Sequence, residues 1–151
     1  MNAYLSHYQN TQVSTASPEQ VLILLYDGAI RFLCQAQQAI ETGDIPMRAE
    51  KINKVVAIVT ELDNSLDHEI GGEIAQHLDA LYNFMIRELL TANLRNDAKR
   101  LKVVEALLTD LRRTWMQAIE INRQQTAEQK EAAIKAEPAR VTEYRQLNAA
   151  L

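Results

Sequence analysis

Apolar residues recur three and four positions apart along most of the chain, which is the spacing of one side of an α-helix. The pattern predicts four helices, within residues 17–43, 44–66, 73–96 and 97–122. Four helices of similar length joined by short loops pack most economically as an antiparallel bundle. The predicted fold class is therefore all-α, an up-down-up-down four-helix bundle with an N-terminal arm and a C-terminal tail or extra helix.

Residues at the predicted helix ends support this interpretation. Ser17, Pro18 and Gln20 form a capping box with proline at the first helical position. Gly43 suits the left-handed residue that ends a helix, and Asp44 can cap the next one.

Two further breaks divide the second half of the predicted bundle. The pair Gly71–Gly72 predicts a break, with Glu73 in the first turn of the following helix, where the helix dipole favours an acid. Asn96 and Asp97 predict a stop followed by a cap. Each predicted helix thus has its own boundary signals.

The two ends of the chain differ from the predicted bundle. Residues 1–16 are polar with a few scattered apolar side chains, and residues 123–151 are rich in Ala, Gln and Glu. Because Pro138 lacks a backbone N–H, we expect it to interrupt any continuous helix in the tail. The predicted organisation is an arm at 1–16, a bundle domain at 17–122, and a polar, partly helical or mobile tail at 123–151.

Composition narrows the class of protein. The chain of 151 residues is 47% hydrophobic, with four Gly and three Pro, too few for the many corners of a β-barrel or sandwich. Cys34 is the only cysteine, so no internal disulfide can form. The start lacks a signal-peptide pattern, and no apolar run approaches the ~18–20 residues of a membrane span. We therefore expect a cytoplasmic protein without membrane insertion.

Charge is unevenly distributed along the chain. The net charge of −4 argues against nucleic-acid binding. Residues 61–79 hold six acids and no Lys or Arg, whereas residues 95–113 hold six bases against three acids. In an antiparallel bundle these two segments lie at opposite ends, so the sequence predicts one acidic and one basic end.

Candidate catalytic residues are few. Glu73 and His77 are four apart, but a di-iron bundle needs two Glu/His pairs, and no second pair exists. His77 also lacks the neighbouring residues that would hold a phosphoryl group. Cys34 has no nearby His or basic cluster, so we expect it to be a small core residue. We predict no catalytic residue, metal site or cofactor; a phosphotransfer or metal-binding bundle enzyme is the weakest alternative.

Apolar residues exceed what four core stripes require. The surplus lies in two helices, at Ile23, Tyr26 and Ile30, and at Phe84, Ile86 and Leu90. These side chains either pack against the arm or the tail, or form a groove for an amphipathic or extended partner segment. A third alternative is that they form the interface of a helical homodimer.

Two short motifs link the sequence to a known family. Leu-Tyr-Asp-Gly-Ala at residues 25–29 and Gly-Gly-Glu-Ile-Ala at residues 71–75 occur in order, followed by Trp115. With them, the chain resembles the FliS family of flagellar secretion chaperones from about Tyr4 to Ala118. The resemblance implies a helical bundle that binds the disordered C-terminal segment of flagellin, prevents its premature polymerisation and delivers it to the flagellar export gate.

The resemblance also implies a set of client-binding residues. Carried over by motif, the N-terminal arm would occupy part of the client groove with Tyr8 as its anchor, and the client surface would comprise Leu22, Ile23, Leu25, Tyr26 and Ile30. Gly28 lies among them, and glycine inside a helix costs about 1 kcal/mol relative to alanine. We therefore expect another backbone, of the arm or the client, to approach the helix closely there.

Overall fold

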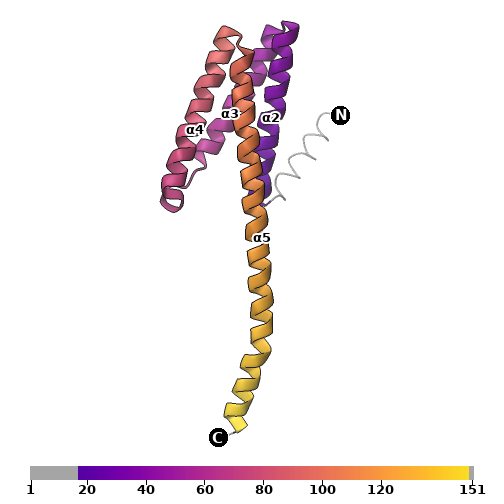
Figure 1. Ribbon diagram of the computed structural model, residues 1–151, viewed down its shortest axis with the longest axis vertical. Helices are drawn as coiled ribbons and strands as arrows, with labels where there is room; N and C mark the ends of the chain where they lie inside the picture. The colour runs from indigo at the N-terminus through magenta and orange to yellow at the C-terminus, as the bar shows by residue number, and fades with distance from the viewer. Residues whose placement is uncertain (1–16, 150–151) are drawn as a thin grey trace, which may run out of the picture. The chain divides into compact units, whose positions relative to one another are not determined.

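The computed structural model describes residues 17–149, with the backbone alone described for residues 137–148. The helices are α2 (Pro18–Thr42), α3 (Ile45–Asn64), α4 (His68–Arg95) and α5 (Ala98–Ala149) (Figure 1). Within the described residues there is no strand, so the all-α prediction is confirmed. The predicted arm, including Tyr8, lies outside the described residues.

The chain divides into two compact units, Met1–Arg113 and Thr114–Leu151. The described part of the first unit comprises α2, α3, α4 and the first turns of α5, which alternate in direction (Figure 1). This is the predicted up-down-up-down arrangement. The described part of the second unit is the rest of α5, up to Ala149.

The predicted caps of α2 and α3 are confirmed. The Ser17 hydroxyl accepts from the Gln20 N–H at 3.2 Å, and the Gln20 side chain accepts from the Ser17 N–H at 3.0 Å. Gly43 has φ of 71°, the left-handed conformation that glycine adopts without steric cost. Asp44 then caps α3 by accepting from the Met47 N–H. Only Gly43 and Asp44 separate α2 from α3, so the loop is short.

The start of α4 differs from the prediction. Helical structure begins at His68, because the Asp67 carboxylate accepts from the first free N–H groups, those of Glu69 and Ile70. Gly72 has φ of 49° and ψ of −123°, so the predicted break at the glycine pair is a kink inside α4. Asn96 ends α4 in the left-handed conformation, as predicted.

The prediction that Pro138 interrupts the tail helix is wrong. α5 continues as one helix of 52 residues to Ala149. Proline removes one backbone hydrogen bond, but the surrounding Ala, Gln, Glu, Lys and Arg have high helix propensity, which outweighs this loss. In the second unit an ion pair between Glu131 and Lys135, four residues apart, adds a small stabilisation at 3.1 Å.

The core of the first unit is formed mainly by the regularly spaced apolar residues of the predicted helices, together with Tyr26 from the predicted surplus. Its largest fully buried side chains are Tyr26, Leu33, Ile52, Val55, Val59, Leu62, Tyr82, Met85, Leu89, Leu101, Val104 and Leu108. The hydroxyl groups of Tyr26 and Tyr82 form a hydrogen bond of 2.5 Å inside this core. Gly28 is also buried, with α3 alongside it, so no second backbone is needed to explain its position.

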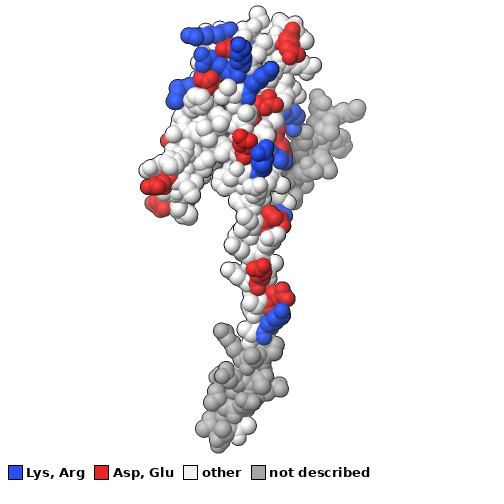
Figure 2. Space-filling model, viewed as in Figure 1, with Lys and Arg blue, Asp and Glu red and all other residues white. Residues whose placement is uncertain are grey.

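The bundle of the first unit is electrostatically polar along its length, as the sequence predicts. Figure 2 shows Lys and Arg gathered where α4 passes into α5, and Asp and Glu at the opposite end of α4. The alternating directions of the helices bring the acidic segment 61–79 to one end and the basic segment 95–113 to the other.

Candidate protein-binding surface

Most of the α2 residues predicted from the family resemblance are covered. Leu22, Ile23, Leu25 and Ile30 are half-buried. Tyr26 has no exposed surface, because its ring fills the core and its hydroxyl is bonded to Tyr82. The expectation that Tyr26 lines an accessible surface is therefore wrong.

One side of α2 packs against α5. Asp27 forms an ion pair with Arg112 of α5 at 2.5 Å, and the Gln37 amide donates to Glu105 of α5 at 2.7 Å. Ile30 lies three residues after Asp27 on the same side of α2, between these two contacts. Part of the apolar surplus of α2 is thus used in packing against α5.

Helix α4, in contrast, leaves many apolar side chains uncovered. Its exposed large apolar residues, with exposed fractions, are Ile70 88%, Ile74 69%, Phe84 37%, Leu90 51% and Leu94 85%. Phe84 and Leu90 belong to the surplus that the sequence predicts, and the third member, Ile86, is half-buried. The surplus on α4 is therefore available on the surface, unlike that on α2.

Part of this apolar surface lies where α4 faces the start of α5. Arg100 of α5 binds Glu88 of α4, which fixes the sides of the two helices that face each other. On α4, Leu81 and Phe84 precede Glu88 at helical spacing, so they lie on the same side as Glu88. On α5, Val103 and Leu107 follow Arg100 on the side towards α4. We call these four apolar residues the α4–α5 seam.

The seam is apolar and partly open. Phe84 is 37% exposed and Val103 45% exposed, while Leu81 and Leu107 are half-buried. Figure 2 shows an uncharged stretch of surface over α4 and α5, between the basic end and the acidic end. At ~1.5 Å per residue, the stretch from Leu81 to Glu88 is ~11 Å long, enough for about two turns of a bound helix.

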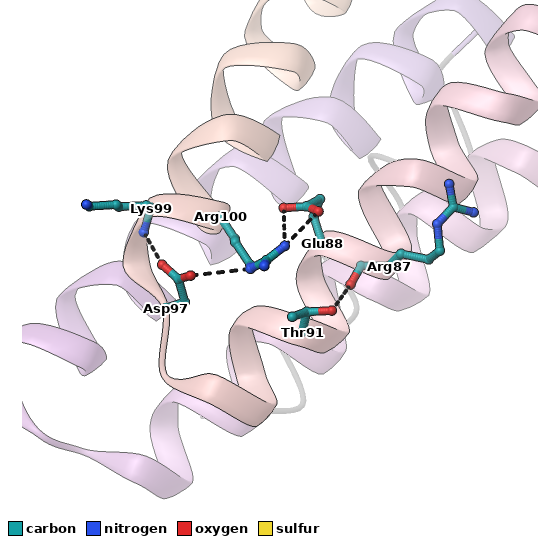
Figure 3. Close-up of polar contacts among 6 residues, drawn as sticks. All are labelled: Arg87, Glu88, Thr91, Asp97, Lys99 and Arg100. Atoms are coloured by element: carbon teal, nitrogen blue, oxygen red, sulfur yellow. Dashed lines mark hydrogen bonds and ion pairs between the residues drawn. The ribbon is translucent and has the colours of Figure 1, made fainter.

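An ion-pair cluster closes the seam at the basic end. The Arg100 guanidinium donates to both carboxylate oxygens of Glu88, at 2.9 and 3.1 Å, and lies 3.3 Å from Asp97 (Figure 3). Both hydrogen bonds come from the one nitrogen Nη1, and hydrogen bonds between charged groups are roughly twice as strong as those between neutral groups. The cluster therefore holds α4 and the start of α5 together.

The described residues offer no catalytic arrangement. Among them, no group of three or more His, Cys, Asp and Glu side chains could hold a metal ion. The expectation that Cys34 is a core residue is wrong, because it is exposed. Its partial burial raises the thiol pKa, as do the negative charge and hydrogen bond of Glu105, so the reactive thiolate is disfavoured.

No described helix is long and apolar enough to cross a membrane. The exposed apolar side chains of α4 and α5, between charged ends of the bundle, form the kind of surface that binds a protein segment.

Comparisons with known proteins agree with this interpretation. The model of the family "Flagellar protein FliS" matches residues 1–124. The chain is 42% identical over 118 residues to the flagellar secretion chaperone FliS of Salmonella typhimurium, covering 78% of this chain and 87% of that protein. It is 38% identical over 122 residues to the flagellar secretion chaperone FliS of Bacillus subtilis, covering 81% and 90%.

A solved structure has the same fold. "Crystal structure of flagellar chaperone from bacteria" aligns with a TM-score of 0.65 and 20% identity, covering 78% of this chain and 96% of that chain. The matching family is one of flagellar proteins, and both relatives are named as flagellar secretion chaperones. The chain belongs to the FliS family of flagellar secretion chaperones.

Proposed function

We propose that this chaperone binds the disordered C-terminal segment of flagellin in the cytoplasm, prevents its premature polymerisation and delivers the subunit to the flagellar export gate. Family membership supports the class of client. The observation that carries the proposal is the uncovered apolar surface of α4 and α5, which a chaperone for an unfolded segment requires.

We place the client on the α4–α5 seam. Full burial of one fully exposed aliphatic or aromatic side chain stabilises by about 1.5–3 kcal/mol, and each of the four seam side chains, already partly buried, can contribute a part of this. A disordered client loses conformational entropy when it binds, so several partly exposed contacts in a row are needed to offset this cost. Aliphatic contacts also tolerate different client side chains, which suits a long segment.

In this proposal the α2 residues contact the client only after a neighbouring element has moved. Leu22, Ile23, Leu25 and Ile30 are half-buried, so a client can contact them fully only where a neighbouring element moves aside. Tyr8, as part of the arm, would compete with the client. No nucleotide is needed for release, because transfer to the export gate can free the client.

A peptide titration tests the proposal. A fluorescently labelled C-terminal peptide of the flagellin from the same organism is titrated with the full chain, and its anisotropy is followed. We expect one-to-one binding and a gain of helical circular dichroism in the peptide. No binding at tens of micromolar, where Kd corresponds to only about −6 kcal/mol, contradicts the proposed function.

Two matched variants locate the site. Val103→Asp changes a seam residue that is 45% exposed, and Leu24→Asp changes a residue of α2 that is 48% exposed. We expect Val103→Asp to weaken binding at least about tenfold and Leu24→Asp to leave it unchanged. Equal effects would move the client away from the seam.

Sedimentation velocity separates the client from a homodimer. If a second copy covers the seam, the wild type sediments as a dimer without peptide and Val103→Asp as a monomer. We expect a monomer in both cases.

A further inference from the structure

A second exposed apolar surface lies at the basic end of the bundle. Leu90 is 51%, Leu94 85% and Ile45 60% exposed. The start of α3 and the end of α4 are joined there by Arg48, which donates to Asn93 at 3.1 Å and to Asn96 at 2.7 Å. We call Ile45, Leu90 and Leu94 the corner patch.

The corner patch is separate from the α4–α5 seam. Leu90 follows Glu88, which faces α5, by two residues, a rotation of ~200° around the helix axis. Leu94 follows Leu90 by four residues and so lies on the same side of α4 as Leu90. The patch and the seam are therefore on different sides of α4 and can be occupied at the same time.

Most acids near the corner patch are already paired, although Glu41, four residues before Ile45, is in no ion pair with another described residue. Figure 3 shows Glu88 and Asp97 both bound to Arg100. At the start of α3, Asp44 accepts from the Met47 N–H, and Glu50 pairs with Lys54 at 3.4 Å. Their negative charge is thus largely compensated within the bundle.

The bases near the patch remain available. Figure 3 shows the Arg87 and Lys99 side chains extending away from the Arg100 cluster. Within the described residues, Arg87, Arg95 and Lys99 form no ion pair with a carboxylate at 4.0 Å or less, and all three are exposed. Arg87 precedes Leu90 by three residues and Arg95 adjoins Leu94, so positive charge borders the apolar side chains.

We infer that the corner patch is a docking site for an amphipathic helical segment of another protein, with acidic residues beside its apolar stripe. Leu90 and Leu94, one turn apart, offer a ridge that suits packing against a second helix. The patch has no aromatic side chain on which a nucleic-acid base could stack. The bordering bases, Arg87 and Arg95, complement carboxylates beside the partner's stripe.

Two synthetic helical peptides of about 18 residues test the inference. They share one stripe of leucines and differ in having Glu or Lys beside it. We expect the Glu peptide to bind the full chain at least about tenfold more tightly than the Lys peptide, with the difference narrowing between about 50 mM and about 500 mM salt. Equal affinities would overturn the inference.

Matched variants of α4 locate the peptide. Leu94→Ser changes a residue that is 85% exposed at the basic end, and Ile70→Ser changes one that is 88% exposed at the acidic end. We expect Leu94→Ser to weaken the Glu peptide about tenfold and Ile70→Ser to have no effect. Since both side chains are exposed, thermal unfolding should show both variants folded.

Other occupants give different results. Val103→Asp would weaken the Glu peptide if the peptide bound the seam, and that outcome overturns the inference. Binding to a membrane would also overturn it. In that case the protein cosediments with anionic phosphatidylglycerol vesicles, Leu94→Ser abolishes this cosedimentation, and the Glu peptide does not bind. A wild-type dimer that Leu94→Ser dissociates would assign the patch to a second copy of this chain, which also overturns it. The inference is independent of flagellin binding, because the peptide assay contains no flagellin.

Discussion

Replacing Gly28 with alanine should stabilise the first unit. A Cβ atom at this position would lie 3.5 Å from Cδ1 of Ile58, which is ordinary van der Waals contact, and 4.0 Å from Nη2 of Arg31. Alanine in a helix interior gains about 1 kcal/mol over glycine, and burial of one methyl group adds about 0.8 kcal/mol. We therefore expect a gain of about 1–2 kcal/mol in the free energy of unfolding.

Urea unfolding followed by circular dichroism measures this gain. Gly43→Ala is the matched control, since Gly43 has φ of +71° with nothing within 4 Å of an added Cβ atom. An alanine side chain would fit there, but alanine adopts this left-handed backbone conformation at a steric cost. We therefore expect the free energy of unfolding to fall by about 1 kcal/mol. The two glycines thus predict opposite signs for the same substitution.

A destabilised Gly28→Ala variant would refute the reasoning, because it would mean that the helix has no room for the methyl group. Binding of the flagellin peptide gives a second readout. If Gly28 only packs against α3, peptide affinity stays unchanged; a loss of affinity in a stabilised variant would show that another backbone approaches this position.

Three further predictions concern a carboxylate pair, an ion pair and the arm. Burial and the neighbouring Asp79 raise the pKa of Asp63, so this group favours the fold below pH 3.8 and costs stability as pH rises through its raised pKa. Asp63→Asn should therefore raise Tm at pH 7 by about 2–4 °C, measured by calorimetry. The difference in Tm between variant and wild type should shrink as pH falls towards 3.8, and a constant difference would contradict this explanation. Arg112→Gln should cost less than about 1 kcal/mol in urea unfolding, because the side chains of Arg112 and Asp27 are 36% and 43% exposed. Deleting residues 1–16 should tighten flagellin-peptide binding by up to roughly tenfold if the arm covers the site, whereas weaker binding would make the arm part of the site.

The helices and their ends could be predicted because their causes are local. Ser17, Gly43, Asp44 and Asn96 act through hydrogen bonds and dihedral angles within a few residues of the chain. Where two local effects compete, the prediction was less accurate. At the start of α4 the Asp67 cap outweighs the glycine pair, and in α5 helix propensity outweighs Pro138.

The candidate site was harder to predict, because periodicity gives the side of a helix but not its neighbour. Tyr26 and Phe84 both belong to the predicted apolar surplus, yet one is fully buried and the other exposed. Val103 and Ile70 were not predicted as surface residues. Their exposure depends on how closely α4 and α5 approach each other, and the only signal for it in the sequence is the Glu88 and Arg100 pair at the helix ends.

The sequence by itself determined the helical class, the caps, the charged ends and, through two short motifs, the family. These features follow from spacing along one chain, since backbone hydrogen bonds and side-chain periodicity act over three or four residues. The tertiary structure alone decided which apolar side chains are covered, because burial depends on packing between helices that are distant in sequence. It leaves more apolar surface exposed on α4 than on the predicted residues of α2, and this exposure is the reason for our proposal that the client binds at α4 and α5.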